Sequence, residues 1–308
     1  MPRKFRLVTR SDFDGLVCAV LLKELDMLES IKFVHPKDMQ DGKIEITGND
    51  ITTNLPYAGA AHLVFDHHLS ETVRNAGARP GNHIIDPQAS SAARVVYDYY
   101  GGDKSFPNVS RELMLAVDQA DSAGYFREDI LHPERWTLLN YIMDPRTGLG
   151  RFRQFRISNY DLMMKLVDAC GTHSIEQILD LPDIRERVEL YLEQQPKAVE
   201  QIRRCSAVHG KLVVLDLRSE EPIWCTNRFT IYALFPQCNI SMHVLWGLKR
   251  QNTVFAAGKS ILDRSSPVNI GGIMLAYGGG GHLAAGTCQV PNEQAEKTLA
   301  ELTARLSA

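Results

Sequence analysis

The feature that most constrains the fold is the segment Asp66-His67-His68, which directly follows the apolar run Leu63-Val64-Phe65. A short apolar run that leads into a carboxylate and two imidazoles is typical of a buried strand whose following loop carries metal ligands. The first predicted strand, residues 5–9, ends in a similar way, in Arg10-Ser11-Asp12-Phe13-Asp14-Gly15. If both strands are parallel in one sheet, their carboxyl ends share an edge, which is where open α/β sheets bind ligands.

These acids and histidines predict a site for divalent metal ions. Taken alone, an Asp-x-Asp-Gly segment is more often a turn, and a His-His pair is more often solvated or hydrogen-bonded. Three carboxylates gathered at one edge of a sheet would repel one another unless cations neutralised them. Oxygen-rich ligands with one or two imidazoles suit Mn²⁺, with Mg²⁺ as the alternative. We therefore predict that the site binds two divalent cations, with Mn²⁺ as the better fit and Mg²⁺ as the alternative.

A third motif is the glycine run 278–281, which is followed by His282. Four consecutive glycines lose much conformational entropy on folding, so an ordered domain needs a reason to carry them. A nest of backbone amides that cradles phosphate oxygens is such a reason. The alternative, a flexible linker, fits poorly because a strand-like run (284–290) and a helical pattern (292–306) follow at once.

Together the three motifs resemble the DHH phosphoesterases, in the expected order and over almost the whole chain. The resemblance is to the two-domain subgroup with a DHH-associated C-terminal domain. That subgroup includes nanoRNases, 3′-phosphoadenosine-5′-phosphate phosphatases, dinucleotide phosphodiesterases and exopolyphosphatase-related proteins. It implies an α/β fold, in which a parallel-sheet DHH domain with a helical extension is joined by a helical connector to a smaller, mixed-sheet α/β domain.

The resemblance also implies a set of metal ligands. In chain order they are Asp12, Asp14, Asp50, His67 and Asp121. Asp50 follows the strand-like residues 43–47 and matches the carboxylate that bridges the two metals. Asp66 is expected to be a weaker ligand or to orient one. Asp118 competes with Asp121, since their helical spacing puts both on one face.

The same resemblance assigns residues to catalysis and to substrate binding. The catalytic candidates are His68, which faces the scissile phosphate, and Arg264 and His282 from the C-terminal domain. The substrate-binding candidates are Arg10, Ser90, Ser260, Asn269, Gly279, Gly280 and Gly281. Helix capping is the simpler role for Ser90 and Ser91. Val8 and Arg10 stand where relatives usually place a histidine or an aspartate, so the first metal site is expected to be short of a ligand.

The chain is long enough for two domains at 308 residues. We predict a DHH catalytic domain at 1–182, a helical connector at 183–206 and a substrate-binding domain at 207–308. Alternating strand and helix patterns predict strands near 5–10, 31–35, 43–48 and 62–66. Helices are predicted at 16–28, 91–100, 111–120, 134–142, 160–169 and 183–204. Further strands are predicted at 211–217, 240–248 and 253–257.

Composition limits the class of partner. The 34 basic and 37 acidic residues nearly balance, so no broad cationic surface for a long duplex nucleic acid is evident. The six cysteines form no CxxC pair, which favours a reducing compartment. The sequence shows no signal peptide and no 18-residue apolar run, so we expect a cytoplasmic protein without a membrane partner. A homodimer stays open.

The predicted function is hydrolysis of phosphoester bonds in short nucleotides by a water activated between two metals. NanoRNA, 3′-phosphoadenosine-5′-phosphate and linear or cyclic dinucleotides are the candidate substrates. One alternative is an exopolyphosphatase that acts on polyphosphate. The other is a protein that binds a nucleotide or polyphosphate without hydrolysing it, and it rests only on Arg10 at the first metal site.

Overall fold

The computed structural model describes residues 3–68, 71, 80–152 and 154–307. The chain forms two compact units, which are described one at a time. The N-terminal unit comprises residues 1–124, 134–145 and 150–189, and the C-terminal unit comprises residues 125–133, 146–149 and 190–308. The two units hold separate sheets, one parallel and one mixed, which confirms the predicted α/β class.

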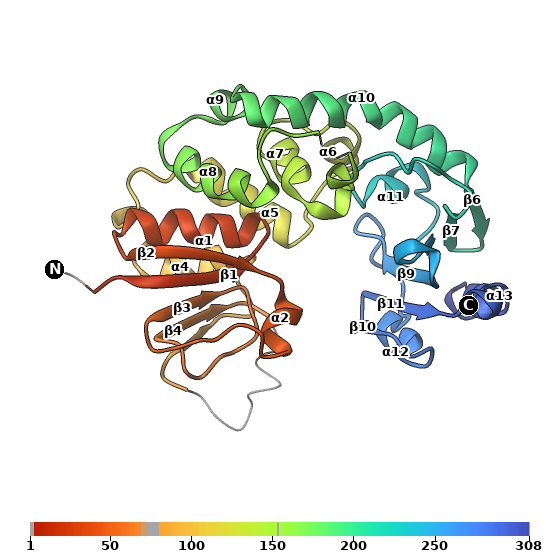
Figure 1. Ribbon diagram of the computed structural model, residues 1–308, viewed down its shortest axis with the longest axis horizontal. Coiled ribbons are helices and arrows are strands. Elements are labelled where there is room, and N and C mark those ends of the chain that lie inside the picture. The colour runs from red at the N-terminus through yellow and green to blue at the C-terminus, as the bar shows by residue number, and fades with distance from the viewer. Residues whose placement is uncertain (1–2, 69–70, 72–79, 153, 308) are drawn as a thin grey trace. The chain divides into compact units, whose positions relative to one another are not determined.

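The N-terminal unit is built on a five-stranded sheet in the order β2-β1-β3-β4-β5 (Figure 1). The strands are β1 (Phe5–Arg10), β2 (Leu28–Val34), β3 (Asp50–Thr53), β4 (Leu63–Asp66) and β5 (His83–Ile85). Every neighbouring pair is parallel. The carboxyl ends of β1, β3 and β4 therefore lie at one edge, as the sequence predicts for β1 and β4.

One strand prediction is wrong. Residues 43–48 form no strand, although Ile44 and Ile46 alternate with polar residues. The alternation has another cause, because both isoleucines pack against a small cluster around Val8 and Leu55. The strand instead begins at Asp50, and all four of its residues are buried.

Helices pack against this sheet through their apolar faces. Helix α1 (Phe13–Glu24) is buried along residues 13–22, since it contacts β1 as well as other helices. The remaining helices are α2 (Pro36–Gln40), α4 (Ala92–Tyr99), α5 (Arg111–Asp121), α7 (Arg135–Met143), α8 (Asn159–Thr172) and α9 (Ile175–Leu179). Helix α1 packs against α4, α5 and α8. This packing holds the first turns of α1 and α4 at the carboxyl edge of the sheet.

Helix α10 (Pro182–Arg204) runs from the N-terminal unit into the C-terminal unit. It covers most of the segment predicted as a connector. The C-terminal unit also takes in α6 (Arg127–Leu131), which packs against α11 (Thr230–Leu234). The predicted domain boundaries stay a prediction.

The C-terminal unit holds a six-stranded sheet in the order β10-β11-β9-β8-β7-β6. The strands are β6 (Ser206–His209), β7 (Leu212–Asp216), β8 (Ile240–Trp246), β9 (Thr253–Lys259), β10 (Gly280–His282) and β11 (Ala285–Val290). Among these strands only β7 and β8 pair in parallel, so the sheet is mixed as predicted. The predicted β8–β9 hairpin is present, whereas β6 and β10 have no counterpart in the sequence prediction.

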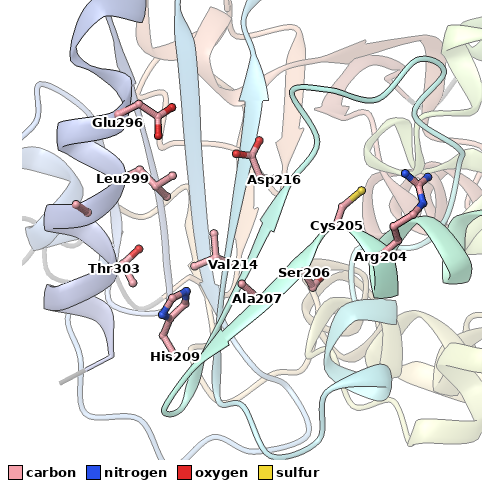
Figure 2. A pocket seen from close by; sticks show the side chains of 11 residues that line it. Arg204, Cys205, Ser206, Ala207, His209, Val214, Asp216, Glu296, Leu299 and Thr303 are labelled. Atoms are coloured by element: carbon pink, nitrogen blue, oxygen red, sulfur yellow. The ribbon is translucent and has the colours of Figure 1, made fainter.

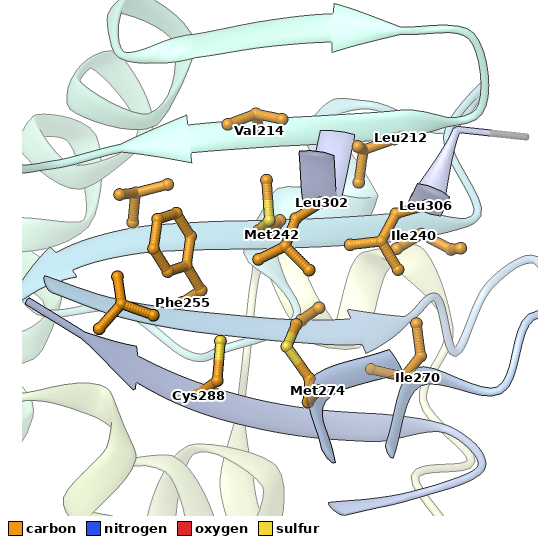
Figure 3. Packing of buried hydrophobic residues seen from close by; sticks show 13 residues of the cluster. Leu212, Val214, Ile240, Met242, Phe255, Ile270, Met274, Cys288, Leu302 and Leu306 are labelled. Carbon is orange, nitrogen blue, oxygen red and sulfur yellow. The ribbon is translucent and has the colours of Figure 1, made fainter. Parts of the chain in front are cut away.

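One core holds this second sheet against helices α12 (Ile270–Leu275) and α13 (Ala295–Leu306). Figure 3 shows Met242 and Phe255 from the strands beside Met274, Leu302 and Leu306 from the helices. All five side chains are nearly inaccessible to solvent. Within the described ranges of the chain, no helix combines the length and apolarity that a membrane span requires.

Candidate metal centre and active site

Three predicted ligands come together in the N-terminal unit. Asp14, His67 and Asp121 each offer a ligand atom, and these atoms lie within 4.8 Å of one another. Asp14 belongs to the first turn of α1, His67 follows β4, and Asp121 ends α5. Two carboxylates and an imidazole at the carboxyl edge of a parallel sheet fit a divalent cation. We call these three residues the ligand cluster.

Asp14 is held in place by the start of α4. The backbone N–H groups of Ala92 and Ala93 donate to its carboxylate at 2.9 and 2.7 Å. Burial raises the pKa of Asp14 well above its usual value, and the negative charges of Asp121 and Asp12 raise it further. A cation at the cluster would offset these unfavourable terms, which is a physical reason for the site to bind one.

His67 directs one ring nitrogen at the cluster. Its Nδ1 is 3.2 Å from the carbonyl oxygen of Ala89, which fixes the ring and leaves Nε2 for the cluster. Nε2 lies 2.9 Å from Asp121 Oδ2. Burial would lower the pKa of His67, but the hydrogen bond and the charge of Asp121 outweigh burial and raise it to about 9. A metal ion bound at Nε2 would displace that proton.

Asp121, and not Asp118, joins the cluster. Asp118 accepts hydrogen bonds from Arg94 Nε and Nη2 at 3.0 and 2.6 Å and from the Ser91 hydroxyl at 2.7 Å. Ser91 is the N-cap of α4, and it also accepts from the backbone N–H of Arg94. Asp118 therefore helps to hold the helix start that binds Asp14. Ser90, the predicted substrate contact, is exposed one residue before this cap.

Asp12 lies beside the cluster. It caps α1 by accepting from the backbone N–H of Gly15 at 3.0 Å. Its carboxylate also pairs with Arg10 Nε at 2.8 Å. Burial would raise the pKa of Asp121, but the hydrogen bond and charge of His67 outweigh burial and lower it. Arg10 adds a smaller contribution in the same direction. Arg10 therefore supplies positive charge at the same sheet edge.

Asp66 and His68 form a second acid–imidazole pair. His68 Nδ1 is 2.7 Å from Asp66 Oδ1. The Asp66 carboxylate is buried, whereas 41% of the His68 side chain is exposed. Asp66 thus orients His68 and leaves its Nε2 as the nitrogen that a ligand can reach.

Asp50 lies at the opposite edge of the sheet from the cluster. It is the first residue of β3, in register with Arg6 of β1, so it lies at the amino ends of both strands. Arg6 donates from Nε and Nη2 to its two carboxylate oxygens at 2.6 and 2.8 Å. The structure therefore does not bring Asp50 to the metal centre, because the strand before it was misplaced by the sequence prediction.

Asp50 instead contributes to stability, and this predicts a pH dependence. Burial alone would raise the pKa of Asp50, but the hydrogen bonds from Arg6 and Thr47 outweigh it and hold the pKa below its usual value. The stabilisation is present above the unfolded-state pKa and is lost as the pH falls through the folded-state pKa. Hydrogen bonds to charged groups contribute about 1.5–3 kcal/mol, and partial exposure of Arg6 favours the lower value.

We expect Asp50→Asn to lower the free energy of unfolding at pH 7, with a difference from wild type that shrinks below about pH 4. Urea unfolding at both pH values measures this. The same variant should bind Mn²⁺ as wild type does. Unchanged stability together with lost Mn²⁺ affinity would show that Asp50 is a metal ligand after all.

The candidates of the C-terminal unit have mainly local contacts. The buried Ser260 hydroxyl accepts from the backbone N–H groups of Leu262 and Asp263 at 3.1 Å each, so it shapes a turn. Asn269 caps α12. Arg264 lies in the adjoining segment, where its Nε is 3.4 Å from the carbonyl oxygen of Ile261.

The second half of the glycine run belongs to an edge strand, which follows a turn at Gly278. Gly280–His282 is β10, paired antiparallel with β11. A Cβ at Gly279 would lie 2.1 Å from the Thr287 carbonyl oxygen, and one at Gly281 would lie 2.2 Å from that of Ala285. Close backbone packing therefore requires glycine at these two positions. His282 is exposed at the end of the strand.

A pocket of the C-terminal unit lies apart from the predicted site residues. It has a volume of about 550 Å³ and lies between β6, β7 and α13 (Figure 2). Its polar side chains are those of Arg204, Cys205, Ser206, His209, Asp216, Glu296 and Thr303. None of the residues predicted for catalysis, substrate or metal lines it.

Three residues that contact aspartates around the ligand cluster were missed by the sequence analysis. They are Ser91 and Arg94, which contact Asp118, and Asn54, which follows β3 and contacts Asp12; only Ser91 has a sequence signal, as a helix cap. Asn54 had no usable signal, because the strand that positions it was itself misplaced. The capping signal of Ser91 was available, but its link to Asp118 depends on helix packing.

Comparison with known proteins identifies the family. The pGpG-specific phosphodiesterase PggH from Vibrio cholerae is 58% identical, with 98% of this chain and 99% of that chain covered and a TM-score of 0.88. RecJ from Thermus thermophilus, in complex with Mn²⁺, is 12% identical, with 98% of this chain and 52% of RecJ covered and a TM-score of 0.54. The similarity to RecJ shows a shared fold only. No family model matches the chain, and no curated protein matches it.

With 58% identity to PggH over nearly the full length of both chains, the protein belongs to the DHH phosphoesterase family. It is a hydrolase that acts on phosphoester bonds. Its ligand cluster of two carboxylates and an imidazole fits the metal dependence expected from the sequence.

Proposed function

We propose that this protein is a phosphodiesterase that hydrolyses the linear dinucleotide pGpG to two molecules of GMP. The observation that carries the proposal is the 58% identity to a pGpG-specific phosphodiesterase over 98% of this chain. The ligand cluster supports it, because it gathers carboxylate and imidazole ligands at the sheet edge where nucleotides bind in open α/β folds.

We propose two divalent cations at this edge, with Mn²⁺ preferred to Mg²⁺. Asp14, His67 and Asp121 would hold one, and Asp12 would contribute to the other. When bound, such cations would lower the pKa of a water and stabilise negative charge on the phosphate oxygens. The pairing of Asp12 with Arg10 makes the second position the weaker one, because the guanidinium competes for the same carboxylate.

The chain's own residues then position the substrate. His68, oriented by Asp66, would face the scissile phosphate with Nε2, which donates to it when both ring nitrogens carry a proton. Arg10 would contact a non-bridging phosphate oxygen, since its charge already acts at this edge. In the C-terminal unit, Arg264 and His282 remain the proposed substrate contacts, with Gly279, Gly280 and Gly281 as further candidates. Ser260 and Asn269 would position the neighbouring backbone through their turn and cap.

A substrate panel tests this proposal. With Mn²⁺ present, pGpG should be converted to GMP faster than 3′-phosphoadenosine-5′-phosphate, a cyclic dinucleotide or polyphosphate, as followed by chromatography of the products. One water is consumed and two GMP are formed for each pGpG. Release of orthophosphate from polyphosphate at a higher rate than GMP from pGpG would instead support the exopolyphosphatase alternative. Binding of pGpG without any product would support the non-catalytic alternative.

The cytoplasmic location and the homodimer stay predictions.

A further inference from the structure

We propose that Asn54 belongs to the metal centre and supplies a neutral oxygen ligand beside Asp12, an inference that rests on the metal centre proposed above. Asn54 follows β3, the strand between β1 and β4. Strand β1 leads into Asp12 and Asp14, and β4 leads into His67. The end of the strand between them is therefore the position from which a further side chain can reach the cations.

The side chain of Asn54 is buried and only half satisfied. Its exposed fraction is 2%. Nδ2 donates toward Asp12 Oδ1 and Oδ2 over 3.3 and 3.5 Å. Among the residues that the structure describes, none gives Oδ1 a hydrogen bond. Because buried carbonyl oxygens nearly always have a partner, this oxygen is suited to contact a ligand bound at the site.

The backbone fixes Asn54 firmly in this place. Its φ of +55° lies in the left-handed region, which asparagine tolerates better than most residues. Its N–H donates to the carbonyl oxygen of Phe65 at 3.1 Å, which ties it to β4. The preceding Thr53 hydroxyl bonds to Thr9 at 2.6 Å, which ties it to β1. A side chain held from both sides is suited to present one atom at a defined point.

A divalent cation is the partner that best fits an amide oxygen at this point. Amide carbonyls are ordinary ligands for Mn²⁺ and Mg²⁺. A cation at Oδ1 would supply the partner that this oxygen lacks, while Nδ2 keeps its contact with the Asp12 carboxylate. A neutral ligand also avoids adding another negative charge next to Asp12, Asp14 and Asp121.

The test is direct Mn²⁺ binding to the metal-free protein, measured by calorimetry without substrate. We expect Asn54→Gly, which suits the positive φ but lacks the oxygen, to weaken Mn²⁺ binding about 10- to 100-fold or to abolish one site. Asn54→Asp keeps an oxygen and should bind Mn²⁺ within a few-fold of wild type or more tightly. Asn49→Gly, at the opposite end of β3, is the matched control and should bind as wild type does.

Wild-type Mn²⁺ affinity and stoichiometry in a folded Asn54→Gly protein would overturn the inference, since only the backbone would then matter. Equal weakening by Asn54→Gly and Asn54→Asp would also overturn it, because it would assign the effect to the lost N–H donor. If Asn54→Gly does not fold, Asn54→Asp decides alone. If the wild-type protein did not bind Mn²⁺, the proposed metal centre itself would be wrong. That outcome differs from wild-type binding by Asn54→Gly, which would overturn only the role of Asn54.

Discussion

Asp121→Ala should lower kcat/KM for pGpG by more than about 100-fold, whereas Asp118→Ala should lower it by about 10-fold. The two aspartates lie one helical turn apart on α5, yet they have different partners. Asp121 contacts His67 within the ligand cluster, so its removal takes a ligand from the proposed metal. Asp118 contacts Arg94 and Ser91, so its removal only loosens the helix start that holds Asp14.

The comparison is matched, because both variants delete one carboxylate from the same helix. Steady-state kinetics with saturating Mn²⁺ give the two losses, and urea unfolding shows whether either variant is partly unfolded. Mn²⁺ titration adds an independent readout, in which Asp121→Ala should lose affinity and Asp118→Ala should keep most of it. A larger loss for Asp118→Ala in a folded protein would mean that the ligand cluster has been assigned wrongly.

Much of this centre could be predicted from the sequence because its parts are local. The strands that lead to Asp12 and His67 are apolar runs, and acids or histidines at their ends are visible in the sequence. Helix periodicity placed Asp118 and Asp121 on one face, but could not choose between them. The choice depends on Arg94 and Ser91, which belong to another helix and meet Asp118 only after packing.

The missed strand shows where local pattern fails. Asp50–Thr53 reads as a polar segment, and it is buried only because it takes a central place in the sheet. Thr53 gains its hydroxyl partner from β1, which no local property reveals. Residues 43–48 showed the alternation of a strand, yet that alternation serves a small hydrophobic cluster. The misplacement carried Asp50 into the predicted site and left Asn54 out of it.

The glycine run illustrates a second limit. Its composition suggested amides open to a phosphate, whereas the structure pairs Gly280 and Gly281 with β11 in an edge strand. The need for glycine at positions 279 and 281 comes from carbonyl oxygens of β11, which a Cβ would meet at 2.1 and 2.2 Å. Such close approaches of two backbones leave no trace in the sequence apart from glycine itself.

Exhaustive chelation should remove hydrolysis entirely. The cluster places two carboxylates beside each other with one imidazole, and Asp14 is buried under charges that raise its pKa. Without a cation, the two carboxylates repel each other, and the cluster offers nothing to activate a water at neutral pH. Mn²⁺ should restore activity at least as well as Mg²⁺, because an imidazole ligand favours the softer ion.

The most direct test of a metal-dependent phosphodiesterase is pGpG turnover by chelated protein before and after Mn²⁺ is returned, with the metal content measured in each sample. We expect no GMP from the metal-free protein, full recovery with Mn²⁺, and no recovery in Asp121→Ala treated in parallel. Undiminished GMP formation by protein shown to be free of metal would contradict the account.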